Sequence, residues 1–218
     1  MKGMETLVGY TRLAALAKKA KVMYDRKGLK WHNWDHISRN FHRARQILVK
    51  ETANVEITLA GVILHDIGYF YGNLQGHAHV GAEHCYGLLV ELGYGQEEVE
   101  GIRHCIVAHD PASGVLPETI EAKIVYDADM LEKADIAQFL KGSLADVAEE
   151  FGTTLSEYAK FFVHRFEPLL QDGRAYYTEA GSRWDNGNLA AIVDIAKRMN
   201  HPDARYPEGD IVELFEFL

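Results

Sequence analysis

Four residues of this chain have side chains of the types that bind metals: His36, the adjacent pair His65 and Asp66, and Asp129. Imidazole and carboxylate groups with water on one ion suit Fe²⁺, Mn²⁺, Co²⁺, Ni²⁺ or Zn²⁺, and the motif contains no soft thiolate ligand. Each residue alone is ordinary, because a lone His is usually a surface or core residue and an Asp near a helix end is often a cap. The ordered set indicates a divalent metal site.

The predicted helices around these residues can bring them together. Adjacent residues on a helix point about 100° apart, so His65 and Asp66 reach one ion most easily where their helix ends. Gly68, two residues on, is a plausible helix stop. His36 lies near a predicted helix start and Asp129 near a predicted helix end. Three separated helices would then supply four inward-facing ligands.

Helical periodicity extends along most of the chain, and no segment has convincing strand character, so the expected fold class is all-α. We expect one domain over residues 1–218, with a motif core at about 34–133 and a helical extension at about 136–218. The helices are predicted at about Thr6–Tyr24, Asp35–Lys50, Val55–Asp66, His77–Leu92, Gln96–His109, from Pro117–Thr119 onward, Ile136–Glu150, Leu155–Leu170, Leu189–Asn200 and Asp210–Leu218. Tyr69–Gly76 is predicted as a loop.

Composition excludes several classes of protein. The formal net charge is −9 and no basic run occurs, which argues against a nucleic-acid polymer as partner. A small anionic substrate stays open, because a bound cation can reverse the local field. The two cysteines, Cys85 and Cys105, have no CxxC spacing, and a reduced, cytoplasmic setting fits best. No apolar run approaches the roughly 18 residues of a membrane span, and no signal peptide is recognised.

The order of the motifs resembles the HD-domain family of metal-dependent phosphohydrolases. The resemblance extends from about Trp34 to Lys133 and depends on three stretches, Trp34-Asp35-His36, Val62-Ile63-Leu64-His65-Asp66-Ile67-Gly68 and Lys123-Ile124-Val125-Tyr126-Asp127-Ala128-Asp129. It implies a compact multi-helix HD-domain bundle. It also implies that His36, His65, Asp66 and Asp129 bind one divalent ion, of Fe, Mn, Co, Ni, Zn or Mg.

Two more histidines, His79 and His109, look like positions where some branches of the family bind a second metal. The resemblance implies that Asp66 would bridge the two ions; otherwise these histidines bind substrate phosphate. His104 competes with His109 for this role. We expect one firmly held ion, with a second that binds weakly or with substrate. Many relatives have a basic residue directly after the Asp-Ala-Asp motif, whereas here the nearest cation is Lys133.

The resemblance implies hydrolysis of a small phosphate ester or anhydride, with a nucleotide favoured, by metal-activated water. Asp66 is expected to orient or deprotonate that water, while His79, His109 and Lys133 stabilise the developing negative charge. No glycine-rich loop follows His109, which weakens assignment to the branch that cleaves cyclic dinucleotides. Two alternatives stay open: a metal-bound ligand-sensing module with little turnover, and a di-iron oxygenase. The sequence does not indicate an oligomeric state.

Overall fold

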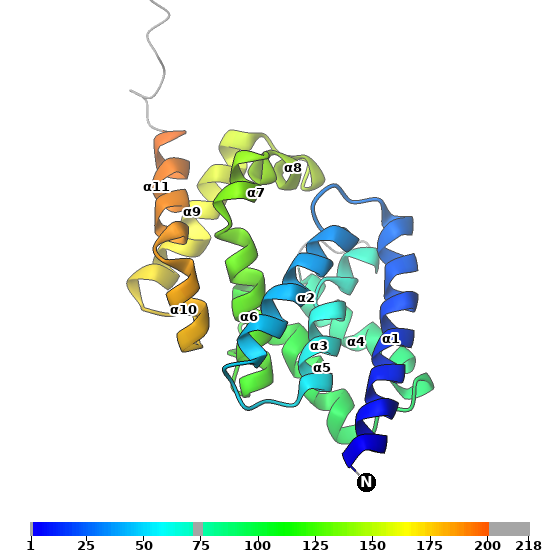
Figure 1. Ribbon diagram of the computed structural model, residues 1–218. Coiled ribbons are helices and arrows are strands. Elements are labelled where there is room, and N and C mark those ends of the chain that lie inside the picture. The colour runs from blue at the N-terminus through cyan, green and yellow to red at the C-terminus, as the bar shows by residue number, and fades with distance from the viewer. Residues whose placement is uncertain (1, 72–75, 201–218) are drawn as a thin grey trace, which may run out of the picture.

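The computed structural model describes residues 2–71 and 76–200, with side chains from residue 11 onward. Every regular element in these ranges is a helix, which confirms the all-α prediction (Figure 1). None of them is both long and apolar enough to cross a membrane. In chain order, with η marking short 3-10 helices, the elements are α1 (Lys2–Lys27), α2 (Trp34–Leu48), α3 (Val55–Leu64), η1 (Ile67–Tyr71), α4 (His77–Glu91), α5 (Gln96–Ala108), η2 (Pro111–Ser113), α6 (Ile120–Lys133), α7 (Ile136–Leu140), α8 (Ser143–Glu150), α9 (Leu155–Gln171), α10 (Glu179–Asp185) and α11 (Asn188–Arg198).

Helix α3 lies inside the N-terminal half of the bundle, where it packs against α1, α2, α5 and α6 (Figure 1). Its sequence is apolar on every side, as expected for a helix with no face toward water. All residues from Thr58 to Leu64 are buried. The burial of α3 carries the two residues that follow it, His65 and Asp66, into the protein interior.

Helix α6 runs between two hydrophobic cores (Figure 1). Ile124, Ala128 and Leu131 pack into the core built with α1 to α5. Tyr126 and Met130, on another side of the same helix, pack into a core that includes residues of α8, α9 and α11. The helical extension therefore shares α6 with the motif core, and the side chains of Asp127, Asp129 and Glu132 on this helix are buried.

Asp127 fastens the extension to α6. Its carboxylate accepts hydrogen bonds from the backbone N–H of Tyr177 (2.9 Å) and of Thr178 (2.7 Å) and from the Thr178 hydroxyl (2.6 Å). Thr178 is also the N-cap of α10. Gly181 leaves room for the carboxylate, since a Cβ there would lie 2.4 Å from Asp127 Oδ2. Asp127, the first aspartate of the Asp-Ala-Asp motif, thus has a structural role, because it holds Tyr177 and Thr178 against α6.

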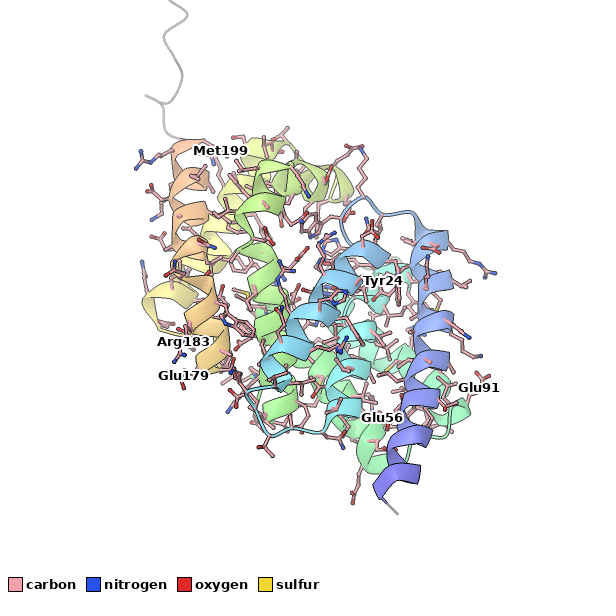
Figure 2. All side chains as sticks on the ribbon, viewed as in Figure 1. Tyr24, Glu56, Glu91, Glu179, Arg183 and Met199 are labelled. Atoms are coloured by element: carbon pink, nitrogen blue, oxygen red, sulfur yellow. The ribbon has the colours of Figure 1, made fainter. Side chains whose placement is uncertain are left out.

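Helix α1 closes the outer side of the motif core. The Arg12 guanidinium binds both Glu56 at the start of α3 and Glu98 at the start of α5. The Tyr24 hydroxyl donates to the carbonyl oxygen of Ile63 over 3.3 Å. Figure 2 shows Tyr24 on the side of α1 that faces the bundle. These contacts hold α1 along α3, and the Tyr24 bond does so at the last turn, directly before the His-Asp pair.

Some predicted boundaries differ from the structure. Helix α1 extends beyond the expected Thr6–Tyr24 at both ends. The helix expected over Ile136–Glu150 is two helices, because Gly142 adopts a left-handed φ of 99° that ends α7. The expected loop Tyr69–Gly76 begins inside the short helix η1. The helix predicted at Asp210–Leu218 lies outside the described residues.

Candidate metal centre

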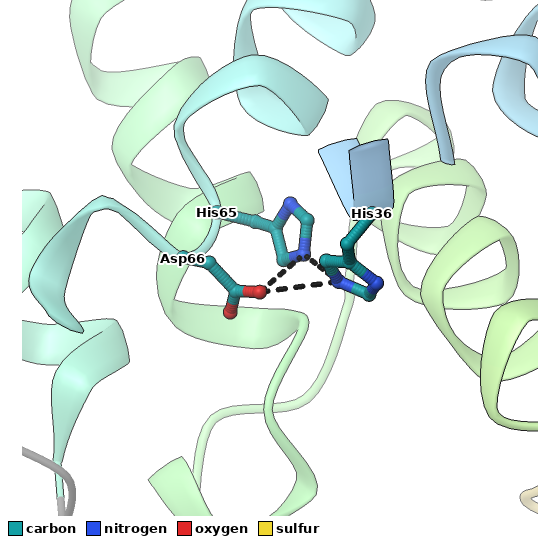
Figure 3. Close-up of side chains that lie close together, drawn as sticks. All are labelled: His36, His65 and Asp66. Atoms are coloured by element: carbon teal, nitrogen blue, oxygen red, sulfur yellow. Dashed lines mark hydrogen bonds and ion pairs between the residues drawn. The ribbon is translucent and has the colours of Figure 1, made fainter. Parts of the chain in front are cut away.

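The helix ends place the first ligand candidates as their local sequences predict. Asn33 caps α2 by accepting from the N–H groups of Asp35 (2.9 Å) and His36 (3.1 Å), so His36 lies in the first turn. Helix α3 ends at Leu64, and His65 is its C-cap. The chain leaves the helix there, and so the side chains of His65 and Asp66 can turn toward the same point (Figure 3).

One oxygen of Asp66 faces two imidazole nitrogens. Asp66 Oδ2 lies 3.2 Å from His36 Nε2 and 3.1 Å from His65 Nε2, as Figure 3 shows. Asp129 Oδ1 approaches the same nitrogens, at 3.5 Å from His36 and 3.8 Å from His65. All four side chains are buried. The structure therefore brings together the four residues predicted as ligands of the first metal.

The other oxygen of Asp66 faces a second pair of imidazoles. Asp66 Oδ1 lies 3.4 Å from His77 Nε2 and 3.4 Å from His109 Nε2. The Nε2 atoms of His77 and His109 are 3.2 Å apart. Asp66 thus stands between two donor sets, which is the arrangement expected of a bridging carboxylate. The structure selects His109, because His104 Nε2 instead accepts from the backbone N–H of Glu118.

His79 is not part of the centre, which corrects its predicted position. Its side chain is exposed, and its Nε2 lies 3.0 Å from the carbonyl oxygen of Ser113. His77 takes the expected place, because it is the first residue of α4 and stacks on Tyr69 with ring centroids 4.1 Å apart. Residues two positions apart on a helix point about 200° apart, so both cannot face one point. The sequence signal for His77 is the glycine before it. Gly76 adopts a φ of 80° and directly precedes α4, so His77 is the first residue of that helix.

Backbone carbonyls orient two of the imidazoles. His65 Nδ1 lies 2.8 Å from the carbonyl oxygen of Val62, and His109 Nδ1 lies 2.5 Å from that of Ile106. With a metal ion bound, the ring proton of each of these histidines would lie on Nδ1, because a carbonyl oxygen can only accept. Each Nε2 would then offer its lone pair to the ion. Such a fixed tautomer is typical of histidines that bind metals.

The centre gathers more acceptors than donors, and this is where a cation fits. Asp66 Oδ2 is buried and has no hydrogen-bond partner among the described residues. A buried carboxylate oxygen without a donor is costly, and a metal ion removes that cost. Burial opposes ionisation of Asp66 and Asp129, but neighbouring imidazoles, and Lys133 beside Asp129, hold the pKa of both carboxyl groups below their ordinary values. The nitrogen and oxygen donors match divalent transition metals.

His36 shows how strongly the centre attracts positive charge. Burial alone lowers the pKa of His36, but Asp66, Glu132 and Asp129 around it raise that pKa to about 9. The carboxylates around the ring therefore favour positive charge at His36, supplied either by a proton or by a metal ion. A metal ion at Nε2 would have to displace the proton, as is general for histidine ligands.

A buried carboxylate behind His36 has no counterpart in the sequence prediction. Glu132 is buried, and its Oε1 lies 3.8 Å from His36 Nδ1. Arg39 and Arg43, both from α2, form ion pairs with the same carboxylate. Arg43 also reaches Asp135. These pairs hold α2 against α6 and so fix the distance between His36 and Asp129. No local sequence pattern predicts that Arg39 and Arg43 pair with Glu132, because the residues lie far apart in the chain.

Lys133 lies at the edge of the centre. Its ammonium forms an ion pair with Asp129 Oδ2, as the spacing of one helical turn allows. Both residues line a small cavity of about 50 Å³ at the centre, together with His36, Asp66, His77 and His109. A phosphate bound in that cavity would lie within reach of the Lys133 ammonium.

The extension also reaches the centre, through Arg165 of α9. The Arg165 guanidinium forms an ion pair with Asp110 Oδ1, and Asp110 Oδ2 lies 3.7 Å from His77 Nδ1. Arg165 lines the small cavity as well. The sequence analysis missed Asp110, Arg165 and His77, although Asp110 follows His109 directly. The contact across 55 residues depends on the packing of α9.

The cysteines take no part in any candidate metal cluster of the described chain. Cys85 and Cys105 are free and buried. Burial raises the pKa of the Cys85 thiol to about 12 and also raises that of Cys105. His84, beside Cys85, stacks instead on Tyr71 with ring centroids 3.8 Å apart. Both cysteines therefore act as small apolar residues of the core.

Comparison with known proteins agrees with this geometry. A family model described as the HD domain matches residues 33–134. YpgQ of Bacillus subtilis (strain 168) is 29% identical over 138 residues, an alignment that covers 60% of this chain. The aligned region spans 66% of YpgQ, just under two thirds of its length.

Solved structures share the fold well beyond the matched motif region. The crystal structure of Bacillus subtilis YpgQ in complex with ADP has a TM-score of 0.65 at 21% identity and covers 90% of this chain and 98% of that one. A protein from Lactobacillus plantarum gives 0.67 at 19% identity, with 87% and 95% covered. A predicted HD superfamily hydrolase from an uncultured Thermotogales bacterium gives 0.57 at 20%, with 85% and 90% covered. The HD-domain model thus matches just under half of the chain, the segment that holds all four residues predicted as ligands of the first metal.

Proposed function

We propose that this chain is a metal-dependent phosphohydrolase that hydrolyses a small phosphate ester or anhydride, with a nucleotide as the favoured substrate. The observation that carries the proposal is the position of Asp66, whose two carboxylate oxygens each face a pair of imidazole nitrogens within 3.4 Å. An inward-facing set of this kind is costly to bury without a cation. A hydrolase would use both the ion and the cavity beside it.

His36, His65, Asp66 and Asp129 are the ligands that we propose for a firmly held ion. His77 and His109 join Asp66 as the proposed ligands of a second ion, which binds more weakly or together with substrate. A divalent ion at this centre would lower the pKa of a bound water toward 7 and neutralise phosphoryl oxygens. Mn²⁺, Fe²⁺, Co²⁺, Ni²⁺ and Zn²⁺ suit these donors, and Mg²⁺ suits them less because it prefers oxygen ligands.

The chain's own groups then have distinct tasks. Asp66 orients the attacking water and can accept its proton, because its two oxygens face both donor sets. Lys133 and Arg165 bind phosphate oxygens from two sides of the small cavity that they line. Arg165 is a planar donor that can bind two oxygens at once, whereas Lys133 acts as a point charge.

The nucleotide is favoured because a relative with the same fold, YpgQ, has been crystallised with ADP. ADP is a ligand of YpgQ, and binding of a nucleotide by this chain is part of our proposal. The position of the reactive bond stays open, and so phosphatase, phosphodiesterase and pyrophosphatase activities all belong in the test.

The test is a panel of phosphate compounds assayed for hydrolysis with each of the six divalent metals. We expect turnover of at least one small compound, and Asp66→Ala should lower it by about 100-fold or more. His79→Ala is the matched control, because this exposed histidine lies outside the centre. Activity of Asp66→Ala within tenfold of wild type would refute the assignment.

The same panel separates the two alternatives. A sensing module would hold metal and bind a compound without turnover. A di-iron oxygenase would require redox-active iron at both positions and would consume oxygen instead of releasing phosphate or pyrophosphate. Neither alternative is favoured by a specific contact in the centre.

A further inference from the structure

A larger cavity of about 550 Å³ adjoins the metal centre and is lined on one side by α9 and the turn that precedes it. Four aromatic side chains line it: Tyr69 from η1, Phe151 after α8, and Tyr158 and Phe161 from α9. These four, together with Arg165, also line the small cavity at the metal centre. The two cavities therefore adjoin each other along these shared side chains.

Three of the rings form one wall. Phe151 and Tyr158 are stacked, with centroids 6.0 Å apart and planes 29° apart. Phe161 continues the row, 5.8 Å from Tyr158 at 33°. Phe161 is 45% exposed, so the row reaches from the protein interior to the surface. A half-exposed row of aromatic rings on the wall of a cavity is suited to contact with another flat apolar surface.

We propose that this cavity binds a planar aromatic ring of the substrate, the base of a nucleotide, while the phosphate lies at the metal centre. The inference rests on the proposed function and names the place where the rest of the substrate binds. A cavity of about 550 Å³ is within the usual range for small-molecule sites. An aliphatic phosphate compound would leave most of the aromatic wall in water.

The rim of the cavity indicates stacking as the main source of affinity. Two carboxylates line the cavity, and both have partners in the protein: Asp110 pairs with Arg165, and Glu157 Oε2 accepts from the backbone N–H and the hydroxyl of Thr154 in a capping box. We expect the cavity to discriminate aromatic from non-aromatic compounds more strongly than one base from another.

Arg165 stands at the junction of the two cavities, paired with Asp110. A ribose and phosphate that join a base on α9 to the metal centre have to pass this guanidinium. The helical extension thus has a role in the proposed site, because α9 supplies both the aromatic wall and the arginine.

The test uses adenosine and ribose as probes, because neither carries a phosphate that could be hydrolysed. Binding of each to the Mn²⁺-loaded full chain is measured by ligand-observed NMR for wild type, Phe161→Ala, Phe161→Tyr and Tyr86→Ala. Tyr86 is the matched control, an exposed aromatic residue of α4 that does not line the cavity. We expect adenosine to bind at least tenfold more tightly than ribose. Phe161→Ala should weaken adenosine binding about 5- to 150-fold, the usual effect of losing one stacked ring.

Phe161→Tyr should restore adenosine binding, and Tyr86→Ala should leave it unchanged. The proposal is overturned if adenosine binds no more tightly than ribose, or if Phe161→Ala changes binding no more than Tyr86→Ala does. Failure of the proposed function has a different signature, namely adenosine binding without hydrolysis of any phosphate compound in the panel. Circular dichroism of each variant confirms that loss of binding is not loss of fold.

Discussion

Gly68→Ala tests whether the close packing of η1 on α4 positions His77. A Cβ built on Gly68 lies 1.9 Å from the carbonyl oxygen of His77, 2.7 Å from its carbonyl carbon and 2.9 Å from the backbone nitrogen of Gly81. All three neighbours are backbone atoms, so no side chain can rotate away. To bring the closest contact to 3.0 Å, the shortest that real Cβ atoms show, the two segments must separate by at least 3.0 − 1.9 = 1.1 Å.

Separation of this size is expensive in a packed interior. Overpacking usually costs about 1–3 kcal/mol, and a clash with backbone belongs at or above the upper end. Alanine also loses less backbone entropy on folding than glycine does, and this offsets at most about 1 kcal/mol of the cost. We therefore expect the free energy of unfolding to fall by about 3 kcal/mol. For a chain of this length that lowers the Tm by about 6–12 °C.

The site should respond as well, because the displaced atoms belong to His77. Its Nε2 lies 3.4 Å from Asp66 Oδ1, and a retreat of α4 by more than 1 Å would break that contact. Urea unfolding and metal analysis of purified Gly68→Ala are the assays. Gly87→Ala is the control on the same helix, since a Cβ there meets nothing within 4 Å, and we expect it to be neutral or slightly stabilising. A loss below 1 kcal/mol with unchanged metal content would refute the reasoning.

Three further predictions follow from the site and its surroundings. His77→Ala should abolish binding of a second metal ion, whereas His79→Ala should leave metal stoichiometry at its wild-type value; equal effects in elemental analysis would contradict the geometry. Burial raises the pKa of Asp127 to about 6, so its protonated form stabilises the fold at low pH, and this contribution is lost as pH rises from about 4 through 6. Relative to Asp127→Asn, the wild-type unfolding free energy in urea should fall by up to about 3 kcal/mol over that window, and a flat difference would contradict the assignment. Cys85 and Cys105 should react with a thiol reagent at pH 8 at least about 100-fold more slowly than in denaturant, because burial raises the pKa of both thiols; equal rates would show that the core opens readily.

The all-α fold and the first set of ligand candidates could be predicted because their signals are local. Asn33 caps the helix that carries His36, and the apolar run of α3 ends where His65 and Asp66 must turn inward. The order of the motifs indicated a resemblance to the HD-domain family, and the HD-domain model matches residues 33–134. Whether these residues bind a metal stays a prediction for elemental analysis. The split of the helix expected at Ile136–Glu150 was missed because a glycine inside a helical pattern is often tolerated, whereas Gly142 here takes a left-handed φ.

The sequence by itself determined the residues that can bind a metal and the helices that carry them. The choice between His77 and His79 belongs to the tertiary structure, because both have the right chemistry and only the docking of α4 on Gly68 decides which one faces Asp66. The pairing of Arg165 with Asp110 is of the same kind. Helix periodicity shows which side of a helix is apolar, but the side chain that reaches a shared point depends on how separate helices pack, and that is set by contacts between residues far apart in the chain.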